Sequence, residues 1–370
     1  MKDAQVIVLA TPVFFLLIGI ELLVGWRRGR NTYRLADALN SIGLGIMSQV
    51  VGLFTRFAAI GLYAIAFEHL ALWRLPADSI AVWVAALLAY DLCYYWVHRC
   101  GHRIALMWAA HAVHHQSEDY NLATALRQTS SGWIVGWAFY LPMAVLGVPP
   151  LVFGGVALID LLYQYWVHTQ QIGRLGGFDR WFCAPSNHRV HHAVNDAYVD
   201  RNYGGILIVW DRLFGTFVEE DDADPCVYGT RSPLRSWNPV WANLQVYAGL
   251  WREMQLCPRW RDKLLLWIKP PGWRPAEVVA RLGEHRFDIA AVRRYDPPMP
   301  AWRQAVALVL FVMLLAGTTL LLWHAHELPM PWLAAGAGAL IAALWVIGAL
   351  CTAPDPTPQH KGATTWPSNV

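Results

Sequence analysis

Long apolar stretches alternate with polar segments along this chain. A helix needs about 20 residues to cross the hydrocarbon core of a bilayer. Stretches near or above that length cover residues 4–25, 41–67, 80–97, 134–167, 305–323 and 332–350. Residues 174–303 are polar and rich in Pro and Trp, so we expect them to lie outside the lipid. The pattern predicts an all-α fold, a multi-pass transmembrane helical bundle.

The fourth apolar stretch is interrupted by Pro142 and by the run Gly147-Val148-Pro149-Pro150. Proline removes a backbone donor and ends or kinks a helix. Each half of residues 133–167 is short for a complete crossing. The sequence therefore favours a tight helical hairpin or a re-entrant pair in this region.

The composition also indicates a membrane protein. Hydrophobic residues make up 56% of the chain and charged residues 15%, against about 45–50% and roughly 25% in soluble domains. The 21 Trp and 14 Tyr residues suit a membrane–water interface. A net charge of +3 is too small to indicate a nucleic-acid partner. The six cysteines form no CxxC pair, so we expect free thiols, and residues 4–25 are expected to be an anchor and not a cleaved signal.

The distribution of basic residues predicts the sidedness. Arg27, Arg28, Arg30 and Arg34 follow the first apolar stretch, whereas the loop at residues 68–79 contains only Arg74. Cytoplasmic loops carry an excess of Lys and Arg. We therefore expect the first cluster in the cytoplasm. Counting crossings from there places residues 98–115 and 174–303 on the cytoplasmic side too.

Nine of the fourteen histidines gather in four places. The first place has the pattern HxxxH, the second and third have HxxHH, and the fourth is a single histidine after the hairpin. Residues three and four apart share a helix face, so each pattern turns two or three imidazoles toward one point. The candidate metal ligands are His98, His102, His111, His114, His115, His168, His188, His191 and His192.

The number of imidazoles indicates more than one metal ion. A structural zinc takes four ligands and a catalytic zinc three plus water. Eight or nine imidazoles instead suit two ions with four or five ligands each. Imidazole binds Zn, Cu, Fe and Ni, so the ligand type alone does not identify the metal. The Glu-x-x-His motif of soluble di-iron bundles is absent from the sequence, and an all-nitrogen ligand set with open positions for dioxygen supports non-haem iron chemistry.

Five polar residues are candidates for orienting the histidines. Asp91 shares a helical stripe with the first box, Asp160 and Gln164 share one with His168, and two asparagines flank the third box. A carboxylate inside a membrane helix costs about 2.5–3.5 kcal/mol on insertion scales, so we expect each to have a partner or a function. The full set is Asp91, Asp160, Gln164, Asn187 and Asn195. We expect the other five histidines, His69, His285, His324, His326 and His360, to be solvated.

The three boxes, in this order and at a lipid boundary, resemble those of the fatty acid hydroxylase and sterol desaturase superfamily of membrane di-iron enzymes. The resemblance covers about residues 90–217. It includes the run Asn202-Tyr203-Gly204-Gly205 and the run Trp210-Asp211-Arg212-Leu213-Phe214-Gly215-Thr216. It implies two iron ions, dioxygen as co-substrate and a membrane lipid whose C–H bond is hydroxylated.

Three further segments are most similar to the alkylglycerol monooxygenase family. They are residues 111–121, the run Tyr165-Trp166-Val167-His168-Thr169 and the run Lys269-Pro270-Pro271-Gly272-Trp273. This narrower resemblance implies an ether-lipid substrate and tetrahydropterin or another external electron donor. Related desaturases add a second histidine near His168, whereas this chain has Ile172 at the fourth position after it.

The resulting interpretation divides the chain into five parts. They are N-terminal transmembrane helices (1–79), a histidine-box catalytic domain with the membrane hairpin (80–220), a cytoplasmic polar extension (221–300), a C-terminal helix pair (301–352) and a disordered tail (353–370). The alternatives are a sterol or carotenoid hydroxylase or desaturase, a metal-binding membrane protein without oxygenase activity, and a transporter or channel. Transporter sites lie near the bilayer midplane, whereas these histidines follow the helix ends. The sequence does not indicate an oligomeric state.

Overall fold

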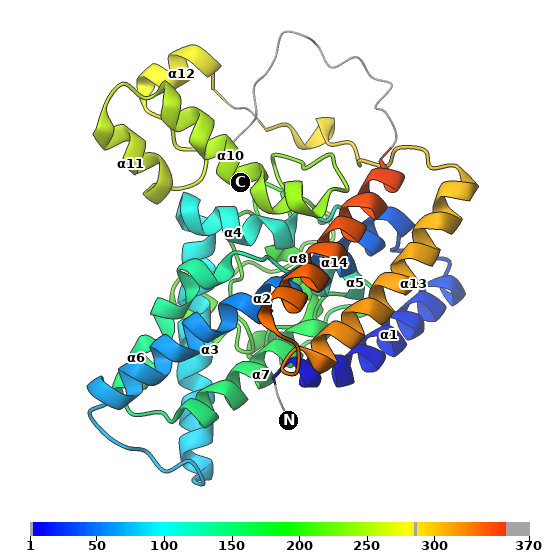
Figure 1. Ribbon diagram of the computed structural model, residues 1–370. Coiled ribbons are helices and arrows are strands. Elements are labelled where there is room, and N and C mark those ends of the chain that lie inside the picture. Colours follow the sequence, from blue (N-terminus) through cyan, green and yellow to red (C-terminus); the bar gives the residue numbers. More distant parts are fainter. Residues whose placement is uncertain (1–2, 285–286, 353–370) are drawn as a thin grey trace.

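The computed structural model describes residues 3–284 and 287–352, and within these ranges the chain folds into helices joined by loops (Figure 1). The all-α prediction is confirmed. The only β-type pairings in the described ranges are two isolated bridges, Phe182–Leu207 and Ala193–Tyr228. The predicted disordered tail, with His360, lies outside these ranges, as does His285.

The longest helices correspond to the apolar stretches of the sequence. They are α1 (Asp3–Arg27), α2 (Leu35–Leu70), α3 (Ile80–Arg103), α13 (Ala301–His324) and α14 (Met330–Cys351). Each contains a segment that is long and apolar enough to cross a membrane. Because α2 has 36 residues, it is about 54 Å long at 1.5 Å per residue and exceeds a hydrocarbon core of about 30 Å.

The remaining helices are shorter than these five. They are α4 (Ala105–His115), α5 (Leu122–Ala125), α6 (Leu141–Val145), α7 (Pro150–Trp166), α8 (Pro185–His191), α9 (Val209–Leu213), α10 (Pro239–Leu256), α11 (Trp260–Ile268) and α12 (Ala276–Leu282). Four 3-10 turns complete the set: η1 (Gly132–Ile134), η2 (Gly136–Tyr140), η3 (Phe178–Arg180) and η4 (Ile289–Ala291).

The broken apolar stretch folds as two short helical segments joined by a turn. Segments η2 and α6 form the first arm, and α7 forms the second. Gly147 has a φ of +85°, and a side chain there would meet the carbonyl of Trp73. Pro149 precedes α7, and Pro150 starts it, where a missing N–H costs no helical bond. This arrangement agrees with the hairpin that the two prolines predict.

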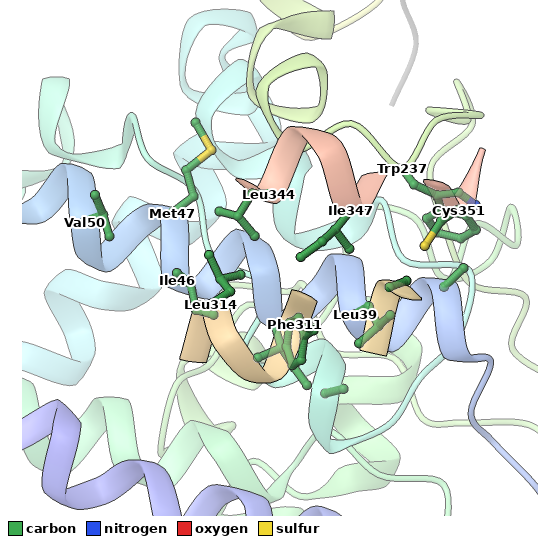
Figure 2. Packing of buried hydrophobic residues seen from close by; sticks show 14 of the residues in the cluster. Leu39, Ile46, Met47, Val50, Trp237, Phe311, Leu314, Leu344, Ile347 and Cys351 are labelled. Carbon is green, nitrogen blue, oxygen red and sulfur yellow. The ribbon is translucent and has the colours of Figure 1, made fainter. Parts of the chain in front are cut away.

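The main core joins α2, α13 and α14. Figure 2 shows Leu39 and Ile46 of α2 beside Phe311 and Leu314 of α13, with Leu344 and Ile347 of α14 in the same cluster. The outer faces of α1, α13 and α14 are different, because large apolar residues such as Leu16, Val312 and Leu320 are exposed on them. Continuous exposed apolar surface of this kind indicates contact with lipid. The fold is therefore that of an integral membrane protein.

Both ends of the bundle are fixed by polar contacts. At one end Arg34, before α2, donates to the Asp119 carboxylate at 2.8 Å and to the Tyr295 carbonyl at 2.9 Å. At the other end the Gln5 side chain of α1 donates to the carbonyl of Trp323 near the end of α13. These contacts place the loop after α1, residues 118–119 and the start of α13 at the same end of the molecule.

Candidate metal centre

Three helices and the turn after α7 bring the nine candidate histidines together. His98 and His102 lie in the last two turns of α3, which continues through Arg103 and so beyond residue 97, where the sequence ends its apolar stretch. The second box lies on α4 and the third on α8 and its C-cap His192, while His168 follows α7. The boxes adopt the helical geometry that their spacing predicts.

The histidines divide into two groups. One contains five and the other four, and within each group the candidate ligand nitrogens all lie within 4.8 Å of one another. The first group is His98, His102, His111, His115 and His191, and the second is His114, His168, His188 and His192.

This division corrects the expectation that each HxxHH box points all its rings to one place. In an α-helix of 3.6 residues per turn, positions i and i+4 differ by about 40° around the axis, whereas i+3 falls about 60° to the other side. His111 and His115 therefore stay in one group, and His114 turns to the other. The third box divides in the same way, so both boxes contribute to both groups.

Backbone carbonyls fix the orientation of four rings. The Nδ1 atoms of His98, His114, His168 and His191 lie 2.8–2.9 Å from the carbonyl oxygens of Tyr203, Arg127, Gln164 and Arg201, respectively. A carbonyl can only accept a hydrogen bond, so Nδ1 carries the proton in each ring. In a neutral imidazole the other nitrogen, Nε2, is then an unprotonated lone-pair donor.

The Nε2 atoms face each other inside each group. In the first group His111 Nε2 is 3.0 Å from both His98 Nε2 and His115 Nε2. In the second, His168 Nε2 is 3.2 Å from His114 Nε2 and 3.1 Å from His188 Nε2. If two ring nitrogens each bind one metal ion at about 2.1 Å, with about 90° between the two bonds, the nitrogens lie about 3 Å apart.

Other atoms of the site also lack a protein partner. The Nε2 atoms of His102 and His191 are buried and accept or donate no hydrogen bond among the described residues. Buried polar groups are almost always satisfied, so such atoms call for an explanation. Facing lone pairs and unpartnered ring nitrogens fit cations that the rings ligate, and the residues present therefore suit two metal ions.

Burial keeps the rings neutral. It lowers the pKa of His114 to about 4 and the pKa values of His111, His115 and His168 well below their usual range. The same holds for the three histidines of the third box, His188, His191 and His192. Neutral imidazole is the form that binds a metal ion.

The five residues expected to orient the histidines have varied partners. Gln164 orients His168, but through its backbone carbonyl. Its side chain accepts from Tyr94 at 2.6 Å and donates to Asp160 at 2.5 Å. Asp91 accepts from the backbone N–H groups of Ile206 and Leu207 and from the Trp210 indole.

Neither asparagine side chain bonds a histidine ring in the described part of the chain. The Asn187 side chain accepts from the backbone N–H of Ala184 and so begins α8. The Asn195 side chain donates to Asp224 at 2.6 Å and accepts from the backbone of Val227. The expectation that they bond the histidine rings of the third box is not met, because both complete local loop structure.

A loop at residues 201–216 is part of the site that the sequence reading missed. The Asp211 carboxylate accepts from the backbone N–H groups of Tyr203 and Gly204 at 2.8 and 2.7 Å and from the Thr216 hydroxyl at 2.6 Å. These bonds hold the loop so that the carbonyls of Arg201 and Tyr203 face His191 and His98. The sequence feature that could have indicated this loop is Asp211, which lies in the run 210–216 that resembles the fatty acid hydroxylase and sterol desaturase superfamily.

Two arginines also support the histidines. Arg127 is fully buried, its carbonyl accepts from His114, and its guanidinium donates to the Val113 carbonyl at 2.7 Å and to Asn40 at 2.8 Å. Arg189, within the third box, forms a bidentate pair with Glu220 at 2.6 Å and donates to the carbonyls of Thr169 and Ile172. Arg189 therefore connects α8 to the turn that carries His168.

A cavity of about 360 Å³ extends from the histidines into the membrane bundle. Three histidines, His111, His114 and His168, line it, so both groups of ligands border it. Polar side chains of Tyr94 and Gln128 also line it. The rest of the wall is largely apolar and comes from α1, α2, α7 and α13, through residues such as Ile7, Phe15, Ile46, Leu161 and Leu322.

Residues outside the site behave as expected where the structure describes them. His69 is exposed, and His324 and His326 lie near Glu327 at the opposite end of the bundle. All six cysteines are free thiols, as the absence of paired spacing predicts.

The fold and the site define a membrane-embedded helical protein with a buried polyhistidine metal centre. Residues 83–216 match the family model described as Fatty acid hydroxylase. Proteins named alkylglycerol monooxygenase from Homo sapiens, Xenopus tropicalis and Danio rerio are 40, 37 and 38% identical to the chain. The alignments cover 74, 83 and 83% of this chain and 61, 68 and 68% of those proteins.

The chain belongs to the alkylglycerol monooxygenase family of lipid monooxygenases, within the fatty acid hydroxylases. It spans 61–68% of the length of these three curated relatives. No solved structure matches it.

Proposed function

We propose that this chain is a membrane monooxygenase that hydroxylates a C–H bond of a lipid, on the alkyl chain of an ether lipid. The proposed cofactors are two iron ions, with dioxygen as co-substrate and tetrahydropterin or another external donor as the source of electrons. The nine histidines are the proposed ligands, five to one ion and four to the other.

One observation carries the proposal: both histidine groups border a largely apolar cavity inside the membrane bundle. A metal-storage or structural site would not need such a cavity. An alkyl chain in the space between α1, α7 and α13 would have one end beside His111, His114 and His168. The cavity wall would exclude water from the reacting carbon, which matters because desolvated sites favour reaction with the bound substrate over side reactions.

The residues of this chain have separate roles in the proposed reaction. The histidines hold the ions, and the backbone carbonyls of Tyr203, Arg127, Gln164 and Arg201 hold four rings with Nε2 turned inward. Loss of the groups that orient metal ligands typically lowers metal affinity or activity by about 10–100-fold. Tyr94 and Gln128 line the cavity with groups able to bond the polar part of a lipid.

Iron bound here would supply the activation of dioxygen. One oxygen atom enters the C–H bond, and the other leaves as water with two protons and two electrons from the donor. Hydroxylation of the carbon next to an ether oxygen gives a hemiacetal, which breaks into a fatty aldehyde and the free glycerol hydroxyl. An alkylglycerol substrate is supported by the names of the relatives and by the resemblance of residues 111–121.

The test is a comparison of lipid products with and without the purified protein under isotopically labelled dioxygen. After reconstitution with ferrous iron and tetrahydropterin, we expect labelled aldehyde and free glycerol from an alkylglycerol. A labelled alcohol elsewhere on a sterol or carotenoid, with the ether lipid intact, would favour the other branch of the superfamily. Tightly bound zinc, together with no oxygen consumption in the presence of any lipid tested, would refute the proposed oxygenase activity.

We further propose that the histidine end of the bundle faces the cytoplasm, as the arginines after α1 indicate. The proposed parts are those of the sequence interpretation, with residues 80–220 as the catalytic domain and residues 221–300 as a cytoplasmic extension. The Asp119 contact of Arg34 supports a common side for the loop after α1 and the segment after the second box.

A further inference from the structure

Helix α11, in the polar extension, has an apolar stripe that no described residue covers. Trp260, Leu264 and Ile268 follow each other at every fourth position, and they are 76, 65 and 60% exposed. We name these three residues the exposed stripe. Positions four apart lie on one side of a helix.

The opposite side of α11 already has its packing partners. Leu266 is buried against Cys257 and Val278, and Asp262 is buried and paired with Arg259 at 2.6 Å. Helix α11 therefore has two apolar sides: one packs against the protein, and the other, the exposed stripe, faces outward. In water the outward one would expose a cluster of large apolar side chains, which monomeric proteins rarely do without a partner.

The position of α11 places this stripe at the membrane boundary. The backbone N–H of Ala105 donates to the carbonyl of Lys269 at 3.0 Å. Ala105 follows the end of α3, whose Ile80–Arg103 segment is a candidate span. Figure 1 shows one end of α11 near that end of α3, with the rest of α11 just beyond it at the edge of the molecule. Trp26 at the end of α1 and Trp302 at the start of α13 are exposed at the same end, as residues of an aromatic belt are.

Basic residues outnumber acidic ones around the stripe. Residues 251–269 contain two acidic side chains, Glu253 and Asp262, and both are buried and paired with arginines. The same range contains five basic residues, Arg252, Arg259, Arg261, Lys263 and Lys269. The Lys263 ammonium lies over the Trp260 ring, 5.0 Å from its centroid. Long basic side chains beside an apolar stripe can reach anionic headgroups while their stems stay in the apolar layer.

We propose that α11 lies in the plane of the membrane surface at the histidine end, with its exposed stripe in the acyl boundary and its basic residues on anionic headgroups. The partner is thus the lipid surface, and the extension is docked on the bilayer. This inference stands on the surface of α11 and not on the proposed reaction.

Site-specific fluorescence quenching tests the position of the stripe. In a variant whose six cysteines are replaced, Leu264→Cys carries a bimane label, and the protein is reconstituted in phosphatidylcholine vesicles containing brominated chains. The matched control is Ala280→Cys, because Ala280 is exposed on α12. Figure 1 shows α12 farther from the bundle than α11. We expect several-fold stronger quenching by bromine at residue 264 than at residue 280, and the reverse for iodide in the buffer.

Anionic lipid tests the basic residues. Adding phosphatidylserine should increase the bromine quenching at residue 264, and the double substitution R261Q/K263Q should remove that increase. Monodisperse elution in detergent checks that each variant is folded. Iodide quenching at residue 264 equal to that at residue 280 would overturn the proposal. Protection from both quenchers would also overturn it, because a protein surface or a second copy would then cover the stripe.

Discussion

The Nε2 atoms of His114 and His168 lie 3.2 Å apart, although each ring donates its Nδ1 proton to a backbone carbonyl. With Nδ1 protonated, neutral rings turn a lone pair toward each other. A shared proton could relieve that contact only if one ring became charged, and burial lowers the pKa of both. A cation between them resolves it, and this relationship underlies the first prediction.

Adjacent residues of the third box should bind different ions. His191 belongs to the group of five and His192 to the group of four. After anaerobic purification with iron supplied, we expect about two irons per chain in the unchanged protein. His191→Ala and His192→Ala should each retain about one, and the double variant should retain none. Metal analysis by mass spectrometry measures this directly.

The control is His326→Ala, at the other end of the bundle, which should retain both ions and full activity. Each single box variant should lose turnover, since C–H hydroxylation needs both ions in the proposed site. Equal losses of both ions from His191→Ala and from His192→Ala would contradict the division into two groups.

The cavity predicts a separation between metal binding and turnover. Ala157 of α7 lines the cavity, so Ala157→Phe should fill it and block a long alkyl chain. We expect at least a tenfold loss of kcat/KM for long-chain substrates, a smaller loss for short chains and unchanged iron content. Leu162→Phe, whose side chain is exposed on the same helix, serves as the control. A uniform loss across chain lengths would count against the cavity as the chain site.

The sequence determines the spans and the boxes well, and it determines the surroundings of the metals poorly. Apolar length alone locates α1, α3, α13 and α14, and helical spacing alone predicts that His98 and His102 share a face. The acceptors that orient the rings are the main-chain carbonyls of Arg201, Tyr203 and Arg127, and any residue type supplies a carbonyl. Their positions depend on tertiary contacts such as those of Asp211, which residue types and spacing do not specify.

The carboxyl group of Asp211 should make stability depend on pH. Burial raises the pKa of Asp211 to about 6, against about 3.9 in an unfolded chain. Because the pKa is higher in the folded protein, the contribution of Asp211 to the free energy of unfolding is greatest below about pH 4. That contribution is lost as the pH rises through about 6. Relative to Asp211→Asn, the unchanged protein should lose up to about 3 kcal/mol of stability between pH 4 and 7.

Thermal unfolding followed by tryptophan fluorescence at several pH values measures that difference. Glu219→Gln, an exposed change on the same segment, should leave the pH profile as it is. Parallel profiles for the unchanged protein and Asp211→Asn would show that Asp211 does not titrate in this range.

The core between α2, α13 and α14 gives a stability prediction. Leu314 is almost fully buried in it (Figure 2), and Leu314→Ala should cost about 2–5 kcal/mol. Met313, one position earlier, is exposed on the lipid side, so Met313→Ala should cost much less. Thermal unfolding in detergent compares the two. Similar losses would mean that the α13 face assigned to lipid is packed against protein.

The last prediction concerns sidedness, on which a shared metal site depends. The nine histidines can share two ions only if residues 98–115, His168 and residues 188–192 lie on one side of the membrane. The contact between Arg34 and Asp119 places the loop after α1 at that same end. The arginines after α1 predict that this side is the cytoplasm.

In a cysteine-free background, single cysteines at Asn31 and Asp222 should react only with membrane-permeant reagents in intact cells. Cysteines at Asp78 and Glu327, in the loops at the other end, should react with impermeant reagents as well. Both pairs are exposed, whereas Glu118 is largely buried and accepts from the Tyr295 backbone, which makes it a poor probe. Labelling of Asn31 and Asp222 from opposite sides would separate the loop after α1 from the extension and exclude this bundle. Labelling of both from outside would keep the bundle and reverse its orientation.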